Sequence, residues 1–193
     1  MPADEQNGEW AYPGIAGELQ RRLLIVFFLI DASYSMAGEK LEQANQAVRE
    51  AIEELRRAAK QWPEAQIMVR AIRFGDGRAE WHLAEAATVE GLVWPDVADA
   101  AGTSALGAAL RLLAPQLDVP PMPVHTKRPI VVLVSDGQPT DDWRSGFTEL
   151  LDKPWGRGSM RVAIGVGDDV DEDVLQEFTG DDGTIVRSLR GLW

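Results

Sequence analysis

The sequence predicts an α/β fold: a doubly wound, mostly parallel central sheet with helices on both faces and one antiparallel edge strand. Two observations support this prediction. Residues 23–30 and 129–135 are short, almost wholly apolar runs, which are typical of strands buried on both faces of a parallel sheet. After each run comes a segment whose apolar residues recur at helical spacing, so strands and helices alternate along the chain.

The first half of the chain contains three expected strands and one long helix. The first apolar run is the first strand. Residues 40–61 predict an amphipathic helix because their apolar residues share one face, and Pro63 helps to end it. Residues 66–74 are rich in Ile, Met and Val and predict the second strand. Residues 80–89 can pair with that strand as an antiparallel hairpin across a Gly-Asp-Gly turn.

The second half continues the alternation. Residues 104–113 predict a helix, with Thr103 or Ser104 as its N-cap and Pro115 just past its end. A loop rich in proline separates this helix from the second apolar run. Further strands are expected at 129–135, 161–166 and 184–186, and further helices at 141–151 and 171–178.

The amino-acid composition excludes several classes of function. Lysine and arginine total 19 against 31 acidic residues, so the net charge is −12, and nucleic acids and anionic membranes, which bind basic patches, are not expected partners. The absence of cysteine excludes disulfide scaffolds and thiolate metal sites and fits a cytoplasmic protein. Residues 1–20 show no signal-peptide pattern and predict a loose leader, so residues 21–193 are expected to form one domain.

Polar residues stand next to the expected strands and helices at three places. They are Asp31, Ser33 and Ser35 after the first strand, Thr103 before the 104–113 helix, and Asp136 after the strand at 129–135. Ligands of open parallel sheets bind outside the carboxyl ends of the strands. Taken singly, each segment has a simpler interpretation as a turn or a helix cap. Together they supply only carboxylate and hydroxyl oxygens, which suit Mg²⁺, or Mn²⁺, and not zinc or copper.

At these residues the chain resembles the von Willebrand factor A family. Asp31-x-Ser33-x-Ser35 fits the metal-ion-dependent adhesion site of that family, Thr103 matches its threonine and Asp136 its second aspartate, within a resemblance that covers about residues 21–186. The resemblance implies that the three hydroxyls contact the metal and that both aspartates act largely through water. It also implies that a partner protein presents an Asp or Glu carboxylate to the metal.

A finer resemblance concerns the runs at 135–143 and 163–167. They are similar to the bacterial TerY-like group, which is associated with tellurite resistance. This implies a metal-dependent interaction module in bacterial stress signalling, with a kinase or phosphatase among the candidate partners. Tyr34 stands where the family usually has glycine, and Tyr34 and Trp143 are expected on the rim of the metal site, where aromatic residues often anchor partners.

The main alternative is a Mg²⁺-dependent haloacid-dehalogenase-like phosphatase, which also opens with an apolar strand and an aspartate. Such an enzyme needs a second acid two residues later, and that position is Ser33. A serine hydrolase is disfavoured because no Gly-x-Ser-x-Gly elbow is present. The two histidines, His82 and His125, are expected to be structural or solvated. We therefore expect a binding module and not an enzyme.

Overall fold

The computed structural model describes residues 22–123, 125–181 and 183–188. In this part of the chain a six-stranded sheet has the order β3-β2-β1-β4-β5-β6. The strands are β1 (Arg22–Asp31), β2 (Ala65–Gly75), β3 (Arg78–Thr88), β4 (Ile130–Ser135), β5 (Met160–Val166) and β6 (Thr184–Ser188). Every neighbouring pair is parallel except β2 and β3, so the expected doubly wound sheet with one antiparallel edge strand is confirmed. The leader expected at 1–20 lies outside the described residues.

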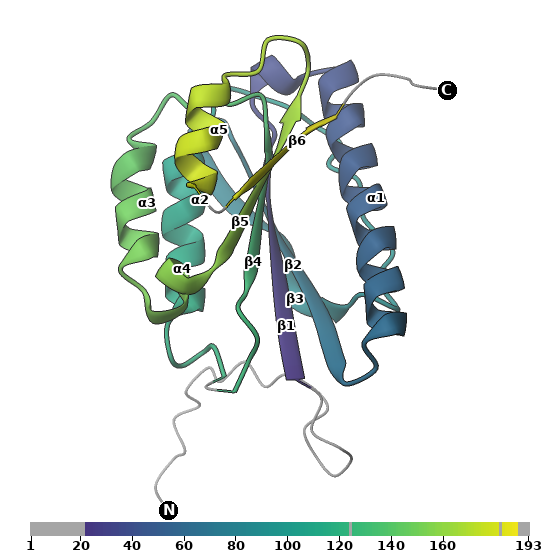
Figure 1. Cartoon of the computed structure of the whole chain (residues 1–193). Helices are drawn as coiled ribbons and strands as arrows, with labels where there is room; N and C mark the ends of the chain where they lie inside the picture. The colour runs from purple at the N-terminus through teal and green to yellow at the C-terminus, as the bar shows by residue number, and fades with distance from the viewer. Residues whose placement is uncertain (1–21, 124, 182, 189–193) are drawn as a thin grey trace, which may run out of the picture.

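The helices lie on both faces of the sheet, as Figure 1 shows. On one face lies α1 (Glu39–Gln61), and the remaining helices lie on the other face. Those are α2 (Leu106–Leu113), α3 (Trp143–Leu151), α4 (Pro154–Gly158) and α5 (Glu172–Thr179). Every expected strand and helix is present with ends shifted by a few residues. The sequence did not predict α4 or the 3-10 turns η1 (Tyr34–Met36) and η2 (Ala114–Leu117), because elements so short carry no readable periodicity.

The order of the strands places the ends of β1 and β4 side by side. From β1 the chain crosses through α1 to β2 toward one edge of the sheet, whereas β4, β5 and β6 follow one another toward the other edge. Right-handed crossovers in opposite directions put their helices on opposite faces. The topological switch point therefore falls between β1 and β4, whose last residues are Asp31 and Ser135.

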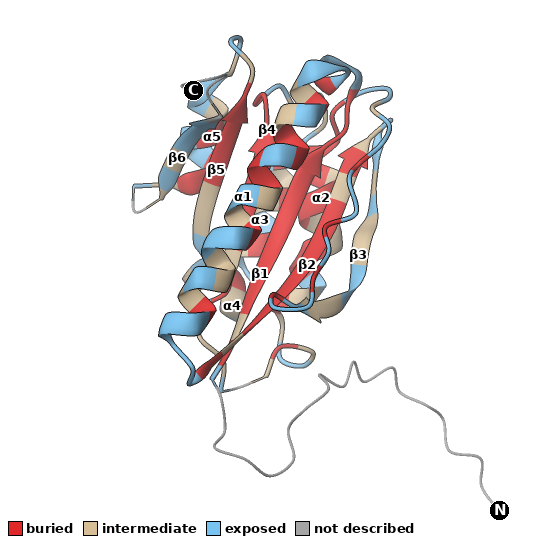
Figure 2. Cartoon of the chain, turned by 90° about the vertical axis from the view of Figure 1, so that its right-hand side faces the viewer, coloured by how far each residue is buried: buried red, intermediate tan, exposed pale blue. Residues whose placement is uncertain are grey.

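Two apolar layers hold the sheet, because successive residues of a strand point to opposite faces. In β1, Val26 and Phe28 belong to the cluster under α1, whereas Ile25 and Phe27 belong to the cluster under α2, α3 and α5. All four are at most 1% exposed. Figure 2 shows this burial along β1 and β4. The site at the ends of these strands is thus built on the most buried part of the sheet.

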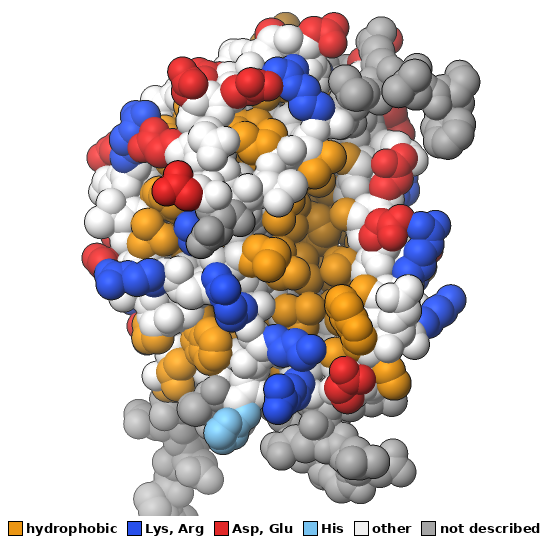
Figure 3. Space-filling view, viewed as in Figure 1, with side chains coloured by type: hydrophobic (Ala, Val, Ile, Leu, Met, Phe, Trp, Pro, Cys, Tyr) orange, Lys and Arg blue, Asp and Glu red, His pale blue; other side chains and the backbone are white. Residues whose placement is uncertain are grey.

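Beside α1 the sheet face is open. A groove of about 1320 Å³ runs along the helix, with the small residues Ala47 and Ala51 on its wall and Val132, Ile164 and Val186 among its lining. In the space-filling view of Figure 3, the hydrophobic side chains that line the groove are visible in orange beside α1. Parallel sheets are normally covered on both faces, so this groove leaves apolar sheet surface in contact with solvent. None of the described helices is both long and apolar enough to cross a membrane.

A buried asparagine anchors the long connection between β3 and α2. Asn45 of α1 is 3% exposed. Its Oδ1 accepts hydrogen bonds from the Val97 amide (2.8 Å) and the Trp94 indole (3.3 Å), and its Nδ2 donates to the Val97 carbonyl (3.0 Å). Because these groups are buried away from water, each needs its partner inside the protein. Asn45 therefore holds a connection that has no helix or strand of its own, together with Arg56, which donates to the Val89 and Leu92 carbonyls.

Asn45→Ala should lower the free energy of unfolding by about 2–4 kcal/mol, because it leaves several buried polar groups without partners. Lys60→Ala, at an exposed position of the same helix, should change it by less than about 0.5 kcal/mol. Urea denaturation of the two variants and the wild type gives the comparison. Equal stability of both variants would show that Asn45 does not hold the connection.

Candidate metal centre

The Asp31 carboxylate is the junction of the site. It is 0% exposed and lies at the carboxyl end of β1. Its Oδ1 accepts the backbone N–H of Ser33 (2.9 Å), and its Oδ2 accepts the hydroxyls of Ser104 (2.9 Å) and Ser135 (2.8 Å). Burial raises the pKa of the Asp31 carboxyl above its ordinary value, although the serine hydrogen bonds act in the opposite direction. The loop after β1, the segment before α2 and the end of β4 thus meet on one buried carboxylate.

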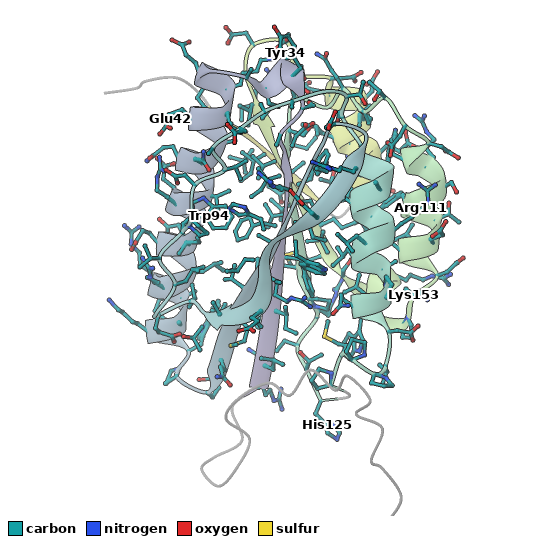
Figure 4. The ribbon with its side chains drawn as sticks, turned by 180° about the vertical axis from the view of Figure 1, so that it is seen from behind. Tyr34, Glu42, Trp94, Arg111, His125 and Lys153 are labelled. Atoms are coloured by element: carbon teal, nitrogen blue, oxygen red, sulfur yellow. The ribbon has the colours of Figure 1, made fainter. Side chains whose placement is uncertain are left out.

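The loop after β1 brings two hydroxyls together, one buried and one exposed. The Ser33 and Ser35 Oγ atoms lie 3.2 Å apart, with Ser33 buried and Ser35 exposed. The Tyr34 amide between them donates to the Gly102 carbonyl (2.9 Å), which ties this loop to the segment before α2. Tyr34 itself is 76% exposed. In Figure 4 it lies at one end of the molecule, and the exposed His125 lies at the opposite end.

The backbone of Gly75 packs directly against the loop that follows β1. A Cβ at Gly75 would lie 2.5 Å from the Ala32 carbonyl oxygen, so a side chain larger than hydrogen does not fit there. The end of β2 can therefore lie directly against the residue that follows Asp31. The Ala32 amide and carbonyl are both bonded to neighbouring segments, to Phe74 (2.7 Å) and Ala101 (2.8 Å) respectively.

The segment before α2 differs from the sequence prediction. Neither Thr103 nor Ser104 caps this helix; its N-cap residue is Ala105, and no side chain of that residue bonds the helix. Instead, the Asp141 carboxylate accepts the amides of Gly107 and Ala108, at 3.0 Å each. Ser104 is therefore free to bond Asp31, and the exposed Thr103 hydroxyl points toward the β2–β3 turn, 3.9 Å from the position of a Gly77 Cβ.

The second aspartate has a lysine beside it. Asp136 is 0% exposed, its Oδ1 accepts the Gln138 amide (3.3 Å), and its Oδ2 lies 3.2 Å from the Lys40 ammonium. The same ammonium lies 2.6 Å from the Asp169 carboxylate. The sequence predicted Asp136 as a site residue and Ser104 only as a possible helix cap, and it predicted no role for Lys40, Asp169 or Ser135. The fold brings these four residues to Asp31 and Asp136.

The expectation that Trp143 lies on the rim is wrong. Trp143 is 3% exposed and packs in the apolar layer under α2, α3 and α5, with its ring 5.9 Å from that of Phe147. Asp142 caps α3 through the Ser145 amide, so Trp143 begins the helix and turns toward the sheet. Of the two expected rim residues, Tyr34 alone has an exposed aromatic ring.

The comparisons with known proteins agree with this architecture. The family profile of the von Willebrand factor type A domain matches residues 26–190. The chain belongs to the von Willebrand factor A family. A search of curated proteins gave no significant match.

Several solved structures share the fold of this chain at 17% sequence identity. An aerotolerance-related membrane protein from Bacteroides fragilis gives a TM-score of 0.58 over 85% of this chain and 90% of that one. Proximal thread matrix protein 1 from the mussel byssus, with a zinc-occupied MIDAS motif, gives 0.57 over 87% and 42%. Manganese-loaded TRAP protein from Plasmodium vivax gives 0.58 over 84% and 64%. At this identity the likeness shows the fold.

The donor chemistry of this von Willebrand factor A domain fits a small divalent cation. Neighbouring ligands of an octahedral ion at 2.0–2.1 Å are about 2.9 Å apart, close to the 3.2 Å between the Ser33 and Ser35 hydroxyls. Among the described residues no three acidic or histidine side chains gather where they could hold a metal. A metal bound at this place would need hydroxyl oxygens among its direct ligands. Asp31 and Asp136, with their oxygens already bonded within the protein, can accept hydrogen bonds from water bound to a metal.

The ion pair of Lys40 with Asp169 gives the stability a defined pH dependence. The hydrogen bond from Lys40 lowers the pKa of Asp169. A lowered pKa means that the ionised carboxylate stabilises the fold above the ordinary aspartate pKa of about 3.9, and that this contribution is lost as the pH falls through the lowered value. Since Asp169 is largely exposed, the contribution is less than about 1 kcal/mol.

Asp169→Asn should therefore lose less stability than the wild type between pH 6 and pH 3. Urea denaturation at both pH values measures the difference, with the exposed Asp99→Asn as control. An Asp169→Asn variant with the same pH dependence as the wild type would contradict the role of this ion pair.

Proposed function

We propose that this von Willebrand factor A domain binds one Mg²⁺, or Mn²⁺, at the carboxyl ends of β1 and β4 and uses it to bind a partner protein. Ser33 and Ser35 would supply hydroxyl ligands, and Thr103 would add a third once its hydroxyl turned from the β2–β3 turn toward the ion. Asp31 and Asp136 would hold metal-bound water. The observation that carries the proposal is the Asp31 junction, which holds three loops together behind two hydroxyls at the spacing of neighbouring metal ligands. When bound, the metal supplies an open coordination position for an anionic oxygen.

The partner group is expected to be a carboxylate of Asp or Glu. Neutral hydroxyls as direct ligands leave the ion most of its positive charge toward the open position. That local charge favours an anionic oxygen although the chain carries −12 overall. Tyr34 is exposed beside the two hydroxyls, so its ring offers apolar contact area next to the ion.

A binding role is favoured over phosphatase chemistry. The position of the second acid in that alternative is Ser33, whose amide and hydroxyl are engaged with Asp31 and Ser35. Serine cannot serve there as a general acid or base near neutral pH. We therefore assign no catalytic residue. A link to tellurite resistance, to stress signalling or to a kinase or phosphatase partner follows from the TerY-like resemblance of the sequence alone and stays a prediction.

Mn²⁺ should bind the wild type at one site in calorimetry, and Mg²⁺ should raise the melting temperature because it binds only the folded state. Asp31→Ala should abolish binding. Since that variant also loses the hydrogen bonds that join three loops, Ser35→Ala, at an exposed position, provides the milder test: binding at least about tenfold weaker in an otherwise stable domain. The exposed Asp99→Ala is the control. Metal binding by Ser35→Ala and Asp31→Ala with wild-type affinity would place the metal elsewhere.

The complex with the natural partner should form in Mg²⁺ and dissociate in EDTA. A pull-down with the purified domain, repeated with the chelator, measures this. Tyr34→Ala should lower the affinity for the partner by about tenfold while leaving the affinity for Mn²⁺ unchanged, because the ring lies beside the ligands and not among them. A partner retained equally well in EDTA would show that it docks on another surface.

A further inference from the structure

Lys40 occupies an unusual position for a cation. It is the second residue of α1, in the first turn of the helix. The helix dipole disfavours positive charge at a helix N-terminus. Holding a lysine in one conformation also costs side-chain entropy. A specific local charge must compensate for both, and Asp136 and Asp169 supply it at 3.2 and 2.6 Å.

The fold holds the lysine in place over a glycine. A Cβ at Gly167 would lie 2.6 Å from the Lys40 Cε and 3.2 Å from its Cδ, and Gly167 has a φ of +90°, which favours glycine. The Lys40 side chain is 21% exposed. Its stem therefore passes across the loop after β5, and the ammonium reaches the Asp136 carboxylate.

The loops on either side of the ammonium are bonded to each other. The Asp171 amide donates to the Asp136 carbonyl (2.8 Å), and the Gln138 side chain donates to the Asp169 carbonyl (3.0 Å). The ammonium thus bridges two segments whose spacing is already fixed.

Lys40 changes the net charge at the proposed metal site. Asp31 and Asp136 bring two negative charges to the ends of β1 and β4, and the Lys40 ammonium offsets one of them. It also occupies the Oδ2 side of Asp136, while the Gln138 amide bonds Oδ1. The affinity of an oxygen site for a divalent cation depends on the charge of its ligands, so a fixed cation beside one carboxylate weakens it.

We propose that Lys40 is a positioning residue that acts as a built-in counter-ion of Asp136 and lowers the affinity of the site for divalent metal. The inference rests on the metal-binding function proposed above. Lys40 compensates the buried charge of Asp136 when no metal is bound, so the site keeps its shape without the ion. The metal then binds exchangeably, and its occupancy can follow the concentration of free Mg²⁺.

The test compares Mn²⁺ affinity by calorimetry in the wild type, Lys40→Met and Lys40→Arg. Lys40→Met removes the charge and keeps an apolar stem of similar length, so it should bind Mn²⁺ at least about tenfold more tightly. Lys40→Arg keeps the charge and should stay within about threefold of the wild type. Lys153→Met is the control for loss of a paired lysine, because Lys153 bonds Asp118 (3.1 Å) at a place far from the site.

Thermal melting separates this role from a purely structural one. Without metal, Lys40→Met should melt below the wild type, since Asp136 loses its counter-ion, and saturating Mn²⁺ should raise its melting temperature by more than it raises that of the wild type. Should Lys40→Met not fold without metal, Lys40→Gln, which can keep a hydrogen bond to Asp136 without the charge, serves in the same comparison.

The outcomes are distinguishable. Unchanged or weaker Mn²⁺ binding by Lys40→Met, with Lys153→Met like the wild type, overturns the counter-ion role and leaves the metal site intact. Equal tightening in Lys40→Met and Lys153→Met would assign the effect to net charge and also overturns it. Absence of Mn²⁺ binding in the wild type refutes the proposed function itself.

Discussion

A buried carboxylate that three loops share is the constraint on which the site depends. Asp31 stands at the end of a central strand with no exposure to solvent. A charge in that position is costly unless hydrogen bonds compensate it, and its partners come from the loop after β1, the segment before α2 and the end of β4. The position of each loop is therefore set by the same group. The position of the two neighbouring hydroxyls follows from it, because the buried Ser33 is bonded to Asp31 and lies next to the exposed Ser35.

The shared carboxylate also explains the helix caps around it. Ser104 serves Asp31 and so cannot cap α2, and the Asp141 carboxylate from the next loop bonds the first amides of α2 instead. This exchange ties the segment before α2 to the loop after β4, as does the Thr140 amide, which donates to the Ser104 carbonyl (3.0 Å). The segment before α2 and the loop after β4 therefore hold each other in place.

Much of the fold could be predicted from the sequence, and the reason is physical. Strands buried on both faces must be apolar throughout, and α1 must show helical spacing because one side packs on the sheet. The carboxylate and hydroxyl residues after β1 and β4 could be predicted to form one site, because the topology brings the ends of central parallel strands together. Apolar runs, helical spacing and polar residues at strand ends are all local patterns of residue type, so the sequence shows them without the structure.

The remaining features depend on side-chain directions in loops, which no periodicity encodes. Thr103 and Ser104 are adjacent, and only the folded loop decides that Ser104 bonds Asp31. Trp143 follows the metal segment in sequence but turns into the core because α3 begins there. In the sequence, Lys40 is one of many charged residues of an amphipathic helix, so nothing marked it as a site residue. Its place in the first turn was one available signal, because the helix dipole disfavours a positive charge there unless carboxylates lie nearby.

The central claim is that Asp31 holds the surrounding segments through hydrogen bonds, while the serine hydroxyls contact the metal directly. Anomalous scattering from crystals of the domain grown with Mn²⁺ tests it most directly, because the peak locates the ion independently of any binding assay. The account predicts one peak within coordination distance of the Ser33 and Ser35 hydroxyls, with Asp31 still accepting hydrogen bonds from Ser104 and Ser135. A peak directly on the Asp31 carboxylate with those two bonds broken, or a peak away from the ends of β1 and β4, would contradict it.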